Sequence, residues 1–170
     1  MRAHVLGKAL QALLLVGFLL PGVSKAQAVK DQILGVWTMV SADSIRADGS
    51  RTQPFGANPK GVIIFSKEGQ FALIQMQSEL PRIAANSRDL GTPEENKAIV
   101  QGSIAYFGTY AVNEGDKTLT LKLEGSTYAN LLASGEQKRL ITSLTADELK
   151  FTNPRTPSGV TLEVSLRRAK

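Results

Sequence analysis

The chain has 170 residues, which suits a single domain, and combines 42% hydrophobic residues with 21% charged residues and a formal net charge of +5. It contains no cysteine, and its single histidine, His4, lies near the start. Disulfides are therefore excluded, as are zinc sites with cysteine or histidine ligands and histidine-dependent catalytic triads in residues 5–170. We expect no metal site, no cofactor and no conventional catalytic residue.

The first residues have the layout of a secretory signal peptide. A basic start precedes an apolar run over residues 9–20, Pro21 breaks that run, and Ala26 puts a small residue at the expected cleavage position. A membrane anchor is the alternative, but it needs about 20 apolar residues. We therefore expect a signal peptide over residues 1–26, a single domain over residues 27–170, and a periplasmic or secreted protein.

Cleavage also changes the charge of the protein. Residues 1–26 carry three Lys or Arg residues and no acid, so their removal lowers the formal net charge from +5 to +2. The basic residues that remain form no stripe along the chain, and nucleic acid is therefore not an expected partner. No membrane span is expected after cleavage.

Short β-prone runs separated by turn signals recur along the rest of the chain, a pattern typical of a meander or a barrel. One run alternates strictly, with Leu119, Leu121 and Leu123 on one face and polar residues on the other. The expected strands, in chain order, cover residues 33–43, 62–66, 70–77, 104–112, 117–124, 136–144, 148–152 and 160–167.

One helix is expected between the third and fourth strands. Thr92 suits the N-cap, Pro93 suits the first helical position, and two acids follow in the first turn. The helix should reach about Gly102 and use Ala98, Ile99 and Val100 to dock on the strands. Residues 126–134 are expected to form a loop or a single helical turn.

Eight antiparallel strands joined to their sequence neighbours can close into an up-and-down barrel without free edges. Such a barrel is wide enough to hold side chains or one small ligand. A two-sheet sandwich with a filled core is the alternative that strand order leaves open.

Several stretches resemble a known family. Gly35-Val36-Trp37 on the first strand and Arg167-Arg168 on the last resemble the calycin and lipocalin pattern, and residues 34–41, 58–65 and 104–110 are similar to the bacterial lipocalin-like domain family. The resemblance implies an all-β fold, an eight-stranded antiparallel up-and-down lipocalin-like (calycin) barrel with one short helix. It also implies that Trp37 plugs one end, with Arg167 or Arg168 over the indole as a cation–π pair. It implies no single activity.

Two tyrosines and an ion pair are candidates for the ligand site. Tyr106 and Tyr110 share one face of their strand and would line a cavity if that face looks inward, with Gly108 making room beside them. The alternative is that they pack outside the barrel against the helix. Glu124 and Arg139 lie on neighbouring strands and would meet either as a buried pair or as an exposed cross-strand pair of little energetic weight.

Two further candidates lie in connections between strands. Arg82 follows the third strand, where it would either meet an acidic ligand head at the barrel mouth or remain an unpaired surface residue. Tyr128 lies in a loop where the family pattern has an aromatic-Pro-Asn-Trp-like sequence. The Pro and Trp are missing here, so the mouth is expected to differ in shape.

These observations favour a non-catalytic protein that binds a small hydrophobic or amphipathic molecule in the barrel. Two alternatives remain open. One is a cyclase or isomerase acting on a small apolar substrate within the barrel, through Tyr106, Tyr110, Glu124 and Arg139. The other is a structural module of the cell envelope with a filled barrel. The ligand and the oligomeric state are not predicted.

Overall fold

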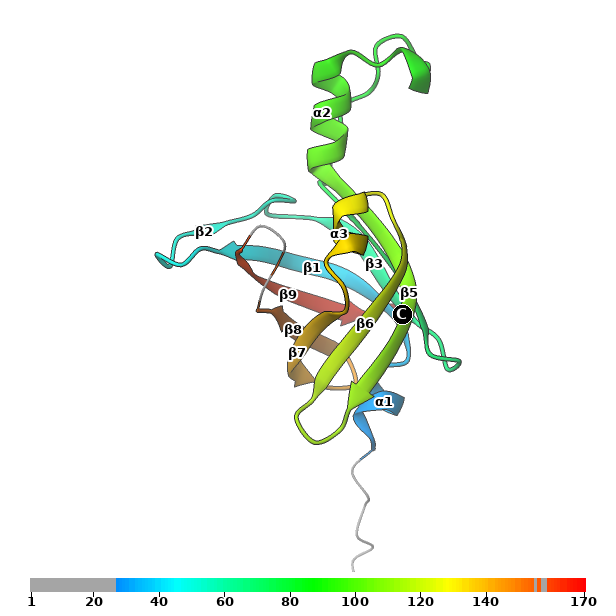
Figure 1. The fold of residues 1–170 in the computed structure, drawn as a ribbon, viewed down its shortest axis with the longest axis vertical. Helices are drawn as coiled ribbons and strands as arrows, with labels where there is room; N and C mark the ends of the chain where they lie inside the picture. Colours follow the sequence, from blue (N-terminus) through cyan, green and yellow to red (C-terminus); the bar gives the residue numbers. More distant parts are fainter. Residues whose placement is uncertain (1–26, 155, 157–158) are drawn as a thin grey trace, which may run out of the picture.

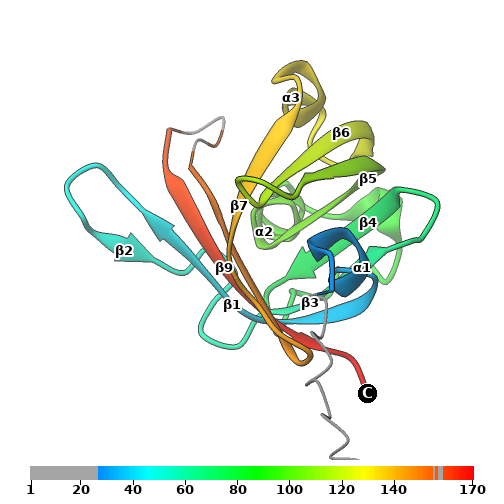
Figure 2. The ribbon, with the colours of Figure 1, turned by 90° about the horizontal axis from the view of Figure 1, so that it is seen from below.

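Eight antiparallel strands close into a barrel in the computed structural model, which describes residues 27–154, 156 and 159–170 (Figures 1 and 2). The expected signal peptide over residues 1–26 lies outside the described residues. Each long strand pairs with the next along the chain, and the last pairs with the first. The strands are β1 (Gly35–Ile45), β3 (Lys60–Phe65), β4 (Gln70–Met76), β5 (Ser103–Asn113), β6 (Thr118–Ser126), β7 (Gln137–Leu144), β8 (Glu148–Asn153) and β9 (Thr161–Arg168).

The closure confirms the predicted barrel and rules out the two-sheet sandwich. It depends on a long β1–β9 ladder that runs from the Trp37–Arg168 pair to the Ile45–Thr161 pair. A two-residue strand that was not predicted, β2 (Arg51–Thr52), extends the sheet beside the end of β1. Every strand predicted from the alternation pattern is present.

The helices differ more from expectation. The predicted helix is α2 (Pro93–Gly102), and its capping box forms: the Thr92 hydroxyl accepts from the Glu95 amide, and the Glu95 carboxylate accepts from the Thr92 amide. Two short helices accompany it, α1 (Val29–Gln32) before the barrel and α3 (Ala129–Ala133) in the connection expected to be a loop or a turn, and a 3₁₀ turn, η1 (Arg88–Leu90), precedes α2. Among the described residues no helix is both long and apolar enough to cross a membrane.

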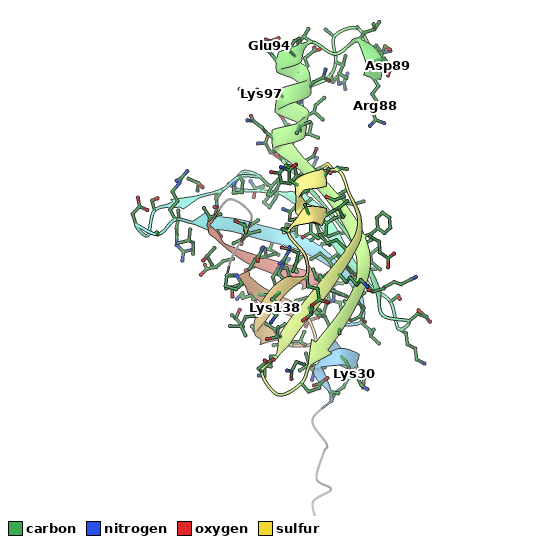
Figure 3. The ribbon with its side chains drawn as sticks, in the orientation of Figure 1. Lys30, Arg88, Asp89, Glu94, Lys97 and Lys138 are labelled. Atoms are coloured by element: carbon green, nitrogen blue, oxygen red, sulfur yellow. The ribbon has the colours of Figure 1, made fainter. Side chains whose placement is uncertain are left out.

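The prediction that α2 docks on the barrel is wrong. The helix stands off one end of the barrel as part of an arm between β4 and β5, with Glu94 and Lys97 projecting from it (Figures 1 and 3). Val100, expected to dock, is 70% exposed. The reason is local: the Glu95 carboxylate also accepts from the Ala84 amide at 2.9 Å, so the helix binds the loop that precedes it.

The two ends of the barrel differ in polarity. Four of the largest fully buried side chains lie toward the end beside α1, where β1 begins and β9 finishes; they are Ile33, Trp37, Leu149 and Leu166. The arm and α3 lie at the opposite end (Figure 1). We call these the tryptophan end and the mouth.

Candidate ligand-binding site

The tryptophan end is closed by a stack of Arg168 on Trp37. The guanidinium carbon of Arg168 lies 4.1 Å from the ring centroid of Trp37, the distance of a cation–π contact. Arg168 also donates from Nη1 to Leu34 O at 2.7 Å and from Nη2 to Gln32 O at 2.6 Å. Arg167, the other residue considered for this role, is exposed and takes no part in the stack.

The backbone conformation at Gly35, where the first strand begins, requires glycine. Its φ is +109°, a conformation that other residues rarely adopt, and a Cβ there would lie 3.3 Å from Nη1 of Arg168. The Trp37 indole donates to Ile33 O at 2.7 Å, so both polar groups of the stack are satisfied.

The two tyrosines of β5 both face inward. Tyr106 is buried, with its ring edge-to-face against Phe71, and Tyr110 is half-buried, with its ring edge-to-face against Phe65. The alternative in which they pack outside against the helix therefore fails. The Tyr110 hydroxyl donates to Ser66 O at 2.8 Å, near the tryptophan end, and is already used by the fold.

Burial, and then the negative charge of Glu68, raise the pKa of the Tyr110 phenol above its ordinary value, so it remains a neutral donor. Gly108, between the tyrosines, does not serve to widen the interior. A Cβ there would lie 2.0 Å from the backbone oxygen of Lys122, because β6 approaches closely at the bulge in the β5–β6 ladder.

Polar side chains are buried only toward the mouth, as far as the described residues extend. They occupy inward positions in the mouth-side halves of four strands and are Ser44, Gln75, Gln137, Arg139 and Asn153. Beside them, between α3 and the ends of β7 and β8, lies a cleft of about 490 Å³; its lining residues are Ser134, Glu136, Gln137, Lys138, Asn153, Pro154 and Thr156. The buried side chains are thus apolar toward the tryptophan end, whereas polar and apolar side chains are both buried toward the mouth.

Arg139 is the most unusual residue of this group, because its side chain is only 3% exposed yet has no carboxylate partner. All 15 Asp and Glu residues lie in the described part of the chain. The ion pairs among the described residues are Arg51–Glu163 and Glu148–Lys150, and neither includes Arg139. Its one hydrogen bond runs from Nη1 to Lys138 O at 3.0 Å.

The expected pair between Glu124 and Arg139 does not form, either buried or exposed. Leu119 lies opposite Arg139 in the β6–β7 ladder, several residues before Glu124. Glu124 is exposed, whereas Arg139 faces the interior. The two side chains are therefore on opposite sides of the barrel wall.

A comparison with known protein families agrees with this architecture. The model of the lipocalin-like domain family matches residues 34–167. The chain belongs to the lipocalin-like domain family. Among curated proteins no match is found.

Two solved structures are similar to this lipocalin-like chain. A lipocalin-like protein from Bacteroides uniformis is 16% identical, with 81% of this chain and 99% of that chain covered and a TM-score of 0.44. A redesigned β-barrel, mFAP1, bound to DFHBI is also 16% identical, with 84% and 100% covered and a TM-score of 0.41.

The remaining candidates lie outside the interior of this lipocalin-like barrel. Tyr128 is exposed at the N-cap of α3, on the mouth side. Arg82 is exposed on the arm and lines a separate cleft, between residues 81–88 and Ile99, that shares no residue with the mouth cleft. The structure therefore brings Arg139 and Tyr106 into the interior and leaves Arg82 apart from both.

Sequence reasoning missed four buried polar residues, namely Ser44, Gln75, Gln137 and Asn153. A signal for one of them exists: Asn153 follows the alternating Leu149 and Phe151, so it falls on the inward face of β8. A polar residue on an otherwise apolar inward face is a sign of either a satisfied core contact or a ligand contact.

Proposed function

We propose that this lipocalin-like protein is exported and binds a small hydrophobic or amphipathic molecule inside the barrel, without catalysing a reaction on it. The observation that carries the proposal is a polarity gradient, because the buried polar side chains all lie toward the mouth and the closed end buries apolar ones. Sites for small molecules are mostly apolar, with a few placed polar groups that orient the ligand. An amphipathic molecule entering tail first would match this gradient.

Export is proposed from the leader pattern of residues 1–26 alone. The absence of cysteine is compatible with an oxidising compartment, since no disulfide can form or scramble there. Detection of the mature chain, beginning near residue 27, in a periplasmic or extracellular fraction would support it. A full-length chain retained in the cytoplasm would contradict it.

The binding proposal is tested by native mass spectrometry of the mature protein purified from its own host. The expected result is a complex that releases a near-stoichiometric small apolar or amphipathic compound on denaturation. Titration of the ligand-free protein with decanoate, decanol, hydrocinnamate and hydrocinnamyl alcohol, measured by calorimetry, is the second arm. A ligand-free mass together with no binding in the titrations would contradict the proposal and favour a filled structural barrel.

A blocking variant places the site within the barrel. Ser44 is an inward residue near the mouth end of β1, and Ser44→Phe should fill the entrance and abolish binding. Val40 is an exposed residue of the same strand, so Val40→Phe is the matched control and should bind as the wild type does. Equal binding by both variants would place the ligand outside the barrel.

A further inference from the structure

We propose that the ligand carries a carboxylate, which Arg139 and Asn153 bind inside the mouth of the barrel. This inference rests on the proposed function, because it names the chemical class of the molecule that the barrel binds.

The charge of Arg139 is not compensated by the protein. A guanidinium keeps its charge in proteins and carries five N–H donors, whereas Arg139 makes a single hydrogen bond, to the carbonyl of Lys138. With every acidic residue of the chain described, none lies within ion-pair distance of it. A buried charge without a partner is costly, and proteins retain such a charge where an oppositely charged group binds.

The unused donors of Arg139 remain accessible. In the described part of the chain, no fully buried side-chain nitrogen or oxygen atom lacks a hydrogen-bond partner. Because Nε and Nη2 of Arg139 have no partner, they must belong to the small fraction of this side chain that is still exposed. Nε and Nη2 are therefore the donors that remain available to a bound anion.

Asn153 supplies a second polar group beside Arg139. The β7–β8 ladder pairs Leu140 with Thr152, so the next pair toward the mouth sets Arg139 opposite Asn153 on the inward face. Asn153 is 5% exposed, lines the mouth cleft, and makes no side-chain hydrogen bond with another described residue. Its amide is therefore free to donate to an anion held by Arg139.

Gln137 has a different role. Its amide nitrogen already donates to Ser134 Oγ at 2.9 Å and to Gly135 O at 3.1 Å, which uses both hydrogens. The residue therefore anchors the end of α3 to β7 and forms a wall of the cleft. The anion site consists of one guanidinium and one amide, contributed by two neighbouring strands.

The number of charges favours a carboxylate over a phosphate. Arg139 is the cation buried in this part of the described interior, whereas Lys138 next to it is exposed and borders the cleft from outside the barrel wall. A phosphate monoester carries a charge of about −1.5 to −2 at pH 7, so one guanidinium would leave part of that charge uncompensated. A carboxylate carries a single charge and two oxygens that match the planar guanidinium.

The test compares ligands that differ only in the head group. Calorimetry measures the affinity of the mature protein for decanoate against decanol, and for hydrocinnamate against hydrocinnamyl alcohol, with decyl phosphate as the competing anion. The acid of at least one pair should bind about 10- to 100-fold more tightly than its alcohol, the range expected for hydrogen bonds to a charged group. Equal affinity for acid and alcohol in both pairs would overturn the inference while leaving the proposed function intact.

Variants assign the effect to the two residues. Arg139→Met and Asn153→Leu keep the side-chain volume and should leave the affinity for the alcohols unchanged. Arg139→Met should abolish the preference for the acid, and Asn153→Leu should reduce it several-fold. Lys122→Met removes an exposed charge on the neighbouring strand β6, outside the lining of the mouth cleft, and is the matched control, which should keep the preference. A preference that survives in Arg139→Met, or tighter binding of decyl phosphate than of decanoate, would overturn the inference.

Folding of the variants is checked by circular dichroism and thermal unfolding. Arg139→Met should unfold at a temperature at or above that of the ligand-free wild type, because replacing an uncompensated buried charge with an apolar side chain is not destabilising. A marked loss of stability would indicate that Arg139 serves the fold, and would contradict its assignment to the ligand.

Discussion

Replacing Arg168 with methionine should open the tryptophan end of the barrel and lower the free energy of unfolding substantially. The guanidinium makes one cation–π contact with Trp37 and hydrogen bonds to the carbonyl oxygens of Leu34, Gln32 and Ala146. A half-buried cation–π contact contributes roughly 1 to 2 kcal/mol. A hydrogen bond to a charged group contributes about 1.5 to 3 kcal/mol.

These contributions are not additive, because freed carbonyls at the rim regain contact with water. We therefore expect a net loss of about 3 to 5 kcal/mol, a large part of the roughly 5 to 15 kcal/mol that stabilises a domain. For a chain of this size the loss corresponds to a fall in Tm of roughly 10 °C. The stability of Arg168→Lys should lie between that of the wild type and that of Arg168→Met, because lysine keeps the charge but loses the planar donor array.

Urea unfolding followed by the fluorescence of Trp37, the single tryptophan of the chain, is the assay. Arg167→Met is the matched control, since its side chain is exposed and outside the stack. The reasoning is refuted if Arg168→Met and Arg167→Met unfold within about 0.5 kcal/mol of one another, the range of ordinary surface substitutions.

Three further predictions concern other parts of the fold. Backbone hydrogen bonds from Lys30 and Val29 lower the pKa of Glu114, so its contribution to stability should be complete above about pH 4.5 and fall as the pH decreases below it; Glu114→Gln should flatten the urea midpoint across that window, and an unchanged slope would contradict this. Thr92→Ala removes the N-cap of α2 and should raise hydrogen exchange in the arm by an amount equivalent to about 1 kcal/mol, with the barrel strands as the internal control; uniform exchange changes would argue against a local cap. Gly108→Ala should destabilise the barrel by about 2 kcal/mol or more, because its Cβ would lie 2.0 Å from the backbone oxygen of Lys122; Gly49→Ala, at a turn with open space but a φ of +80°, should cost only about 1 kcal/mol in thermal unfolding, and equal losses would refute the packing explanation.

Local patterns predicted much of the barrel because the alternation of apolar and polar residues that marks a strand can be read within a few neighbouring residues. Leu119, Leu121 and Leu123 alternate with polar residues, and their strand is observed as β6 with that face inward. The capping residues of α2 also act within one helical turn, and they were identified correctly. By contrast, α1 is capped from a distance of more than eighty residues by Glu114, and no local pattern predicts such a contact.

The Glu124–Arg139 prediction failed for a reason that the alternation already contained. Glu124 is out of phase with the three leucines of its own strand, which places it on the outside of the barrel once those leucines face inward. The docking of α2 failed for a different reason. Apolar residues in a helix show that a partner exists, but not whether that partner is the barrel or the loop beside the helix.

By itself the sequence determined the strands and the turns, because these follow from period-two alternation and short connections. The tryptophan end was predicted from the resemblance of Gly35-Val36-Trp37 and Arg167-Arg168 to the calycin pattern, and only the structure showed that Arg168 makes the stack. Only the tertiary structure decided which face of β7 is inside. Its two faces each carry an aliphatic residue near Arg139, yet Ile141 is 5% exposed and Leu140 is 45% exposed. Alternation cannot choose between such faces, and the choice depends on the ladders with β6 and β8. That choice places Arg139 inside the barrel, where its charge has no carboxylate partner.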